Sequence, residues 1–261
     1  MKIDRDLHIH TYLSACCADK TNQTPARILQ LATDMGLTTL GFSDHIWANP
    51  AIVPSKWYQP QDETQISRLR SDLAGLTPKI KTLVGCEADM IAPGQFGITR
   101  KFAAQLDYVL LSCSHFHMQG FVEQPAGATP RAVGEHLLKF FLSGVQAGLA
   151  TAIAHPFLPC GFMERYDEIL AALTDAELRD AFGVARERGV GIEITTGFLP
   201  QVSDRPFSLE TPTRLLWLAK QAGCKFTFGS DAHDPARQKK LPLLECFVRA
   251  LDLGPQDMVA L

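Results

Sequence analysis

The chain has 261 residues, of which 46% are hydrophobic and 20% charged; this suits one α/β barrel domain over residues 1–261, since such barrels need about 250 residues, and disfavours intrinsic disorder. The 28 acidic and 25 basic residues give a net charge of −3, which argues against duplex nucleic acid as a partner because its binding proteins carry a basic patch. No apolar stretch approaches the about 18 residues of a membrane helix, so we expect no membrane partner.

Short apolar runs alternate with longer helical patterns along the chain. The predicted strands are Ile3–His8, Thr38–Ser43, Thr82–Cys86, Tyr108–Ser112, Ala150–Ala154, Val190–Ile194 and Phe226–Gly229. The predicted helices are Ala26–Met35, Asp62–Leu73, Thr129–Ala147, Asp175–Arg188, Glu210–Ala222 and Leu241–Ala250. This order predicts a parallel α/β fold, either a barrel or an open sheet. No glycine-rich turn follows the first strand, which disfavours a nucleotide-binding open sheet.

Two connections are longer than usual, Ile46–Gln61 and Gly120–Pro130. Long loops that follow strands in such folds commonly belong to active sites. The first loop contains Trp47, Trp57 and Tyr58, which could pack against the organic part of a small ligand or could only anchor the loop.

The cysteines give no sign of a disulfide framework. There are seven of them, an odd number, without a CxxC pair, and residues 1–11 contain no apolar signal core. We therefore expect reduced thiols and a cytoplasmic protein.

Seven of the eight histidines lie at or just beyond the end of a predicted strand, and only His136 lies in a helical pattern. The seven are His8, His10, His45, His115, His117, His155 and His233. The carboxyl ends of parallel strands form one rim, which also receives Asp44, Glu87 and Asp231. A single histidine there is often structural, but so many imidazoles and carboxylates would be costly to bury without a shared partner.

Two short motifs strengthen the prediction of a metal cluster. In His8-Ile9-His10 the alternate side chains of a strand point the same way, so both imidazoles can reach one ion. Asp231-Ala232-His233 repeats this spacing with a carboxylate. Such ligands suit zinc, manganese or iron.

The motifs as a set resemble those of the polymerase and histidinol phosphatase (PHP) family, in the family's order and over essentially the whole chain. They are Asp6-Leu7-His8-Ile9-His10-Thr11, Ser43-Asp44-His45, Gly85-Cys86-Glu87, Ser114-His115-Phe116, Ala154-His155-Pro156 and Gly229-Ser230-Asp231-Ala232-His233. The resemblance implies a distorted (β/α)7 barrel that holds up to three metal ions and hydrolyses phosphate esters.

The resemblance also implies three ligand sets. The first ion would take His8, His10, Glu87 and Asp231, the second Glu87, His115 and His155, and the third His45, His233 and residue 16. Histidinol phosphatases usually have histidine at that last position, where this chain has Cys16. A thiolate favours zinc or iron over manganese. Cys17 beside it is expected to be a buried thiol.

On this reading Glu87 bridges two ions that activate a hydroxide, with Asp231 as a second catalytic carboxylate. His117 could protonate the leaving alkoxide or bind phosphate, or be an ordinary rim histidine. Arg165 and Arg205 are candidates for binding phosphate, while Asp44 is expected to orient His45 or its loop.

The function expected from the resemblance is hydrolysis of a small phosphate monoester at a site with two to three divalent ions, as in histidinol phosphatases. The alternatives are a phosphodiesterase or nuclease acting on nucleotides and an amidohydrolase-type C–N hydrolase. A metal-bound PHP module without catalytic activity is a further alternative. The sequence does not indicate the oligomeric state.

Overall fold

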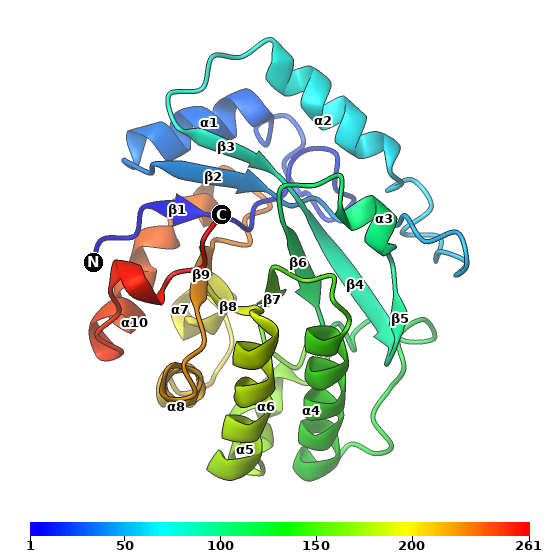
Figure 1. Ribbon diagram of the computed structural model, residues 1–261, viewed down its shortest axis with the longest axis vertical. Helices are drawn as coiled ribbons and strands as arrows, with labels where there is room; N and C mark the ends of the chain where they lie inside the picture. Colours follow the sequence, from blue (N-terminus) through cyan, green and yellow to red (C-terminus); the bar gives the residue numbers. More distant parts are fainter.

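The computed structural model describes residues 1–261 and arranges the strands in two sheets (Figure 1). The smaller sheet is parallel and consists of β1 (Arg5–Asp6), β2 (Thr39–Phe42) and β3 (Lys81–Val84). The larger sheet has the order β5-β4-β6-β7-β8-β9, in which only β5 is antiparallel to its neighbour. Its strands are β4 (Cys86–Ala92), β5 (Gln95–Phe96), β6 (Val109–Ser112), β7 (Ala152–Ala154), β8 (Gly191–Thr195) and β9 (Phe226–Gly229).

The two sheets follow one another round a distorted barrel. β3 continues into β4 through Gly85, whose amide donates to Phe42 O at 2.9 Å. On the opposite side the Leu7 amide donates to Phe228 O at 2.9 Å, which joins the chain after β1 to β9. The predicted parallel α/β fold with a distorted barrel is confirmed, although its strands form two sheets and no single closed ladder.

Helices cover the outside of both sheets (Figure 1). α1 (Pro25–Asp34) and α2 (Thr64–Ala74) lie over the smaller sheet, whereas α4 (Pro130–Gln146), α6 (Asp175–Arg188) and α8 (Glu210–Gln221) lie on the other side of the molecule. The shorter helices are α3 (Arg100–Ala103), α5 (Tyr166–Ala171), α7 (Pro200–Ser203), α9 (Pro235–Gln238) and α10 (Glu245–Ala250). None of these helices has both the length and the apolar composition needed to cross a bilayer.

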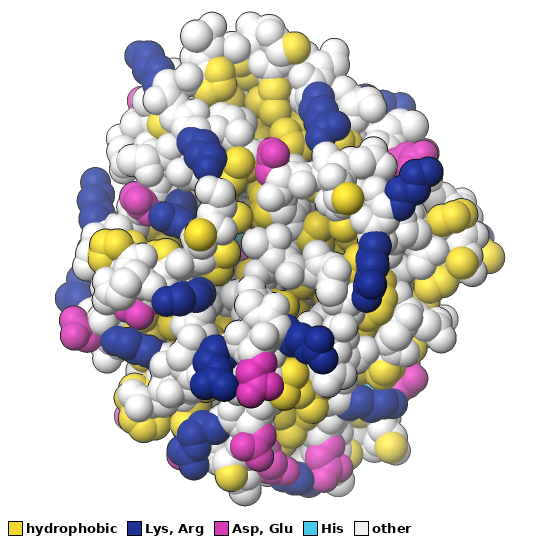
Figure 2. Space-filling view, viewed as in Figure 1, with side chains coloured by type: hydrophobic (Ala, Val, Ile, Leu, Met, Phe, Trp, Pro, Cys, Tyr) yellow, Lys and Arg dark blue, Asp and Glu magenta, His cyan; other side chains and the backbone are white.

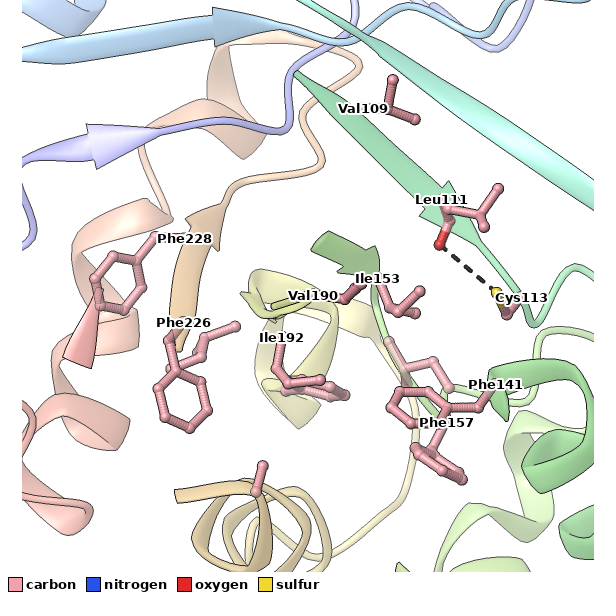
Figure 3. Packing of buried hydrophobic residues seen from close by; sticks show 14 of the residues in the cluster. Val109, Leu111, Cys113, Phe141, Ile153, Phe157, Val190, Ile192, Phe226 and Phe228 are labelled. Carbon is pink, nitrogen blue, oxygen red and sulfur yellow. Dashed lines mark hydrogen bonds between the residues drawn. The ribbon is translucent and has the colours of Figure 1, made fainter. Parts of the chain in front are cut away.

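The alternation of side chains along the strands produces two apolar clusters. Outward-facing residues such as Val109, Leu111 and Ile153 belong to a core of 62 buried residues (Figure 3). There Phe141 of α4 packs against Phe157 with ring centroids 4.9 Å apart. The inward-facing residues form a second cluster of six, namely Leu7, Leu83, Tyr108, Leu110, Ala152 and Ala154. Because successive residues of a strand face opposite ways, the polar residues of the inner series gather inside the barrel.

Two predicted strands differ from the structure for identifiable reasons. The first ends at Asp6 because the His8 amide bonds to the Asp6 carboxylate at 3.2 Å and so leaves the ladder. The third is divided at Gly85, where a Cβ would lie 2.5 Å from the Tyr108 ring. The Tyr108 hydroxyl crosses the barrel and donates to Leu7 O at 2.7 Å.

Two further elements differ from prediction. The hairpin of β4 and β5 was not predicted; it turns at Gly94, whose φ is +78°. The predicted last helix begins instead as a 3₁₀ turn, Leu241–Leu244, before α10.

Candidate metal centre

The histidines and carboxylates predicted from the strand ends gather at one end of the barrel. His8 and His10 follow β1, His45 follows β2, and Glu87 lies on β4. His115, His155, and Asp231 with His233 follow β6, β7 and β9 respectively. The parallel direction of these strands is what brings residues more than 200 positions apart into one group.

Glu87 lies at the centre of this group and is 1% exposed. Its Oε2 faces three imidazole Nε2 atoms, those of His8 at 3.1 Å, His45 at 3.3 Å and His10 at 3.4 Å. Its Oε1 faces His155 Nε2 at 2.9 Å and His115 Nε2 at 3.8 Å. Each oxygen of one carboxylate thus points toward a different set of imidazoles, which is the arrangement of a bridging ligand.

Three sets of side chains could each hold an ion. Two of them match the implied sets: His8, His10, Glu87 and Asp231 form one, and Glu87, His115 and His155 form another. The third consists of His10, Cys16 and His45. The implied set had His233 where this set has His10. In the structure His233 lies beside the set, and its ring stacks on that of His10 with centroids 4.4 Å apart.

Opposite charges in the site outweigh the cost of burial. Burial opposes ionisation of Glu87, but His45 and His8 hold the pKa of its carboxyl well below the usual range. Burial likewise opposes ionisation of Cys16, but the positive charge at His10 and hydrogen bonds from His10, His233 and His45 lower its pKa to about 3. These contacts favour the thiolate of Cys16, the form that binds metal.

Two buried carboxylates that the sequence analysis missed hold the ring nitrogens facing away from Glu87. Glu193 of β8 accepts from His8 Nδ1 at 2.7 Å and from the His155 amide at 2.5 Å. Asp89 of β4 accepts from His115 Nδ1 at 2.6 Å. The bond from the His155 amide to Glu193 helps to hold His155 at a φ of +29°, a strained conformation for a non-glycine residue.

These outer bonds fix how the rings face the site. Since Glu193 and Asp89 accept from Nδ1 of His8 and His115, Nε2 of each ring is the atom directed toward Glu87. A bound cation would take the place of the Nε2 protons and balance the buried carboxylates. Imidazole, carboxylate and thiolate donors together fit a divalent transition metal such as zinc.

A cavity of about 510 Å³ opens beside these ligands. Its outer wall contains Trp57, Met118 and Phe121, so both long loops contribute to it as predicted. Trp47 does not line the cavity; it packs on Tyr58 at 4.9 Å and anchors the loop through Ile52 O at 3.0 Å. His117 lines the cavity 5.1 Å from the ring of His115.

The two arginines predicted to bind phosphate are not brought to the cavity. Arg165 pairs with Glu168 at 3.0 Å and donates to Ala128 O at 2.5 Å, while Arg205 pairs with Glu164 at 2.7 Å. Their loop positions suggested a role, but these local partners hold both guanidinium groups elsewhere. Asp44 accepts from the Thr11 amide at 2.6 Å and so orients the loop that contains Thr11. It forms no hydrogen bond with the ring of His45.

Cys16 and Cys17 provide a matched test of the third set. Cys17 is buried and its thiol donates to His233 O at 3.5 Å, whereas Cys16 lies among the imidazoles. We expect Cys16→Ser to lose about one metal equivalent per chain, because a neutral hydroxyl is a poor zinc ligand, and Cys17→Ser to lose none. Elemental analysis of both purified variants measures this difference. Equal metal contents would show that Cys16 is only a buried thiol.

Comparisons with known proteins point to one family. The family model of the PHP domain matches residues 6–197. A probable histidinol-phosphatase of Deinococcus radiodurans is 28% identical over 247 residues, covering 88% of this chain and 86% of that protein.

Two solved structures share the fold. One is a histidinol phosphate phosphatase of Lactococcus lactis complexed with zinc, L-histidinol and phosphate, with a TM-score of 0.58, 19% identity and coverage of 95% of this chain and 93% of that one. The other is an ochratoxinase of A. niger, with a TM-score of 0.52, 10% identity and coverage of 98% and 68%. At these identities the similarity concerns the fold alone.

Proposed function

The chain belongs to the PHP domain family and is a phosphoesterase, like the histidinol phosphatases that it resembles. From this premise we propose that it hydrolyses a small phosphate monoester at a site for two to three divalent ions. The observation that carries the proposal is the position of Glu87. One buried carboxylate faces imidazoles of different ligand sets with its two oxygens, at 2.9 Å on one side and 3.1 Å on the other.

We assign the ions to three sets of residues. His8, His10, Glu87 and Asp231 would hold one, Glu87, His115 and His155 a second, and His10, Cys16 and His45 a third, with His233 beside it. When bound, such ions supply a nucleophilic water and neutralise the charge of the phosphoryl oxygens. Asp89 accepts from His115 Nδ1 and Glu193 accepts from His8 Nδ1, so Nε2 of each ring is the atom left to hold an ion.

Two cavity imidazoles belong to none of these sets: His233, which stacks on His10, and His117. Burial and the nearby charge of His115 lower the pKa of His117 to about 4. A neutral imidazole donates one hydrogen bond and accepts another. We assign His117 to contact the phosphate or the leaving oxygen, on the substrate side of the ligands.

The shape of the cavity supports a compact substrate. Its wall of Trp57, Met118 and Phe121 offers apolar contact for the organic part of a small molecule. No lysine or arginine lines it, and on the face seen in Figure 2 the basic side chains are scattered rather than joined in a groove. An extended single strand needs such a basic groove with repeated stacking sites.

We therefore expect the specificity constant kcat/KM to be higher for phosphomonoesters than for an oligonucleotide. Steady-state kinetics on histidinol phosphate, a simple nucleotide and a short single-stranded oligonucleotide measure this order. If the oligonucleotide has the highest kcat/KM, the monoester proposal is wrong and the chain is a phosphodiesterase or nuclease.

A further inference from the structure

Asp89 receives contacts from more than the metal ligands. It is fully buried, and its Oδ1 accepts from His115 Nδ1 at 2.6 Å. Its Oδ2 lies 3.4 Å from His45 Nδ1 and also accepts the hydroxyl hydrogen of Tyr58. His115 and His45 belong to different ligand sets. One carboxylate therefore contacts two ligand sets. Through Tyr58 it also contacts the long loop Ile46–Gln61, called the aromatic loop below.

Tyr58 is the centre of the aromatic loop. Its ring is fully buried, with ring centroids 4.7 Å from Trp57, 4.9 Å from Trp47 and 6.0 Å from Phe121. Trp57 and Phe121 are the wall of the cavity that faces the substrate. A change in the position of the Tyr58 hydroxyl is thus transmitted to the residues that would hold the organic part of the substrate.

His45 and Asp89 lie close together but form no hydrogen bond. His45 Nδ1 is a buried nitrogen without a hydrogen bond, and the acceptor nearest to it, Asp89 Oδ2, is the oxygen that Tyr58 also uses. An ion on Nε2 requires the proton of His45 to be on Nδ1, and polarises that N–H toward an acceptor. A carboxylate oxygen can accept two hydrogen bonds, so ion binding at His45 would let Asp89 Oδ2 hold His45 and Tyr58 together.

We propose that the Tyr58–Asp89 pair couples metal loading to the aromatic wall, so that ion binding orders the substrate cavity. Tyr58 and Asp89 are positioning residues in this account, since both act through other side chains. The coupling is reciprocal: if ions stabilise the wall, a loosened wall weakens ion binding by the same factor. The inference rests on the ligand sets of the proposed function, but it concerns binding and not turnover.

Tryptophan emission during a zinc titration tests this inference. Trp47 and Trp57 flank Tyr58, whereas Trp217 lies in α8 and is 46% exposed, so Trp217→Phe is the parent for all variants. Metal-free full-length protein is titrated with zinc while bound equivalents and emission are followed together. Zinc is redox-inert and does not quench by electron transfer, and because His45 lies 5.1 Å from Trp57, the comparison with Tyr58→Phe isolates the part of the change that depends on Tyr58.

In the parent we expect the emission to change with the same midpoint as zinc binding. Tyr58→Phe, which keeps the ring and removes the hydroxyl, should lose more than half of this change and bind zinc about tenfold more weakly. Tyr166→Phe is the matched control, because its hydroxyl is also buried but has no hydrogen-bond partner, and it should behave as the parent does.

Two results would overturn the coupling. One is a parent whose emission does not respond to bound zinc, which needs no variant and holds even if Tyr58→Phe fails to fold. The other is a Tyr58→Phe protein that keeps both the full response and the parent's zinc affinity. A parent that binds no zinc at all would overturn the proposed metal centre as well, so the two failures are distinguishable.

Discussion

Glu87→Gln should reduce phosphatase activity by about 1,000-fold or more, because bridging two ions contributes several kcal/mol to the transition state. The amide has nearly the shape of the carboxylate but places an NH₂ group where one oxygen now faces imidazoles, at 2.9 Å or 3.1 Å. Steady-state rates on a phosphomonoester at saturating zinc or manganese measure the loss.

The control for this variant is Glu187→Gln, the same substitution at an exposed glutamate of α6. It should leave the rate unchanged, and circular dichroism should show that both variants fold. Full activity of Glu87→Gln at saturating metal would exclude the bridging role.

Gly229→Ala should destabilise the protein and weaken metal binding together. A Cβ at this position would overlap the Glu193 carboxylate and lie 2.5 Å from the Cβ of His8. Glu193 cannot move without losing its bonds to His8 and to the His155 amide. We expect a loss of about 3 kcal/mol in the free energy of unfolding, as for an overpacked core, and a metal affinity lower by about 10- to 100-fold.

Thermal denaturation and zinc titration of the variant measure both effects. The matched control is Gly183→Ala in α6, where a Cβ would meet nothing within 4 Å and where alanine should stabilise the helix by about 0.5–1 kcal/mol. If Gly229→Ala keeps the zinc affinity of the unchanged protein, Glu193 does not position His8.

The ligands that the structure gathers were largely predictable because parallel strands impose a simple rule. A polar residue at the carboxyl end of such a strand must lie on one rim, so His8, Glu87 and Asp231 could be grouped without knowing any distance. The contacts within the group were not predictable. His10, for example, reaches the third set while His233 stacks beside it, which depends on how the loops turn.

The outer carboxylates were missed although the sequence carries a signal for each. Asp89 lies two residues after Glu87 and so faces the same way along β4. Glu193 interrupts the apolar run Gly191–Thr195, and a carboxylate in a buried strand needs a partner. Arg165 and Arg205 show the opposite error, because a loop position says nothing about the glutamates within reach.

The central claim is that bound divalent ions in the Glu87 site carry the hydrolysis. The most direct measurement is phosphate release from a monoester by chelator-treated protein to which zinc or manganese is returned stepwise, with bound metal counted in each sample. The account predicts that the metal-free protein is inactive and that activity returns as at least two equivalents bind. Metal-free protein that hydrolyses the ester at the full rate would contradict it.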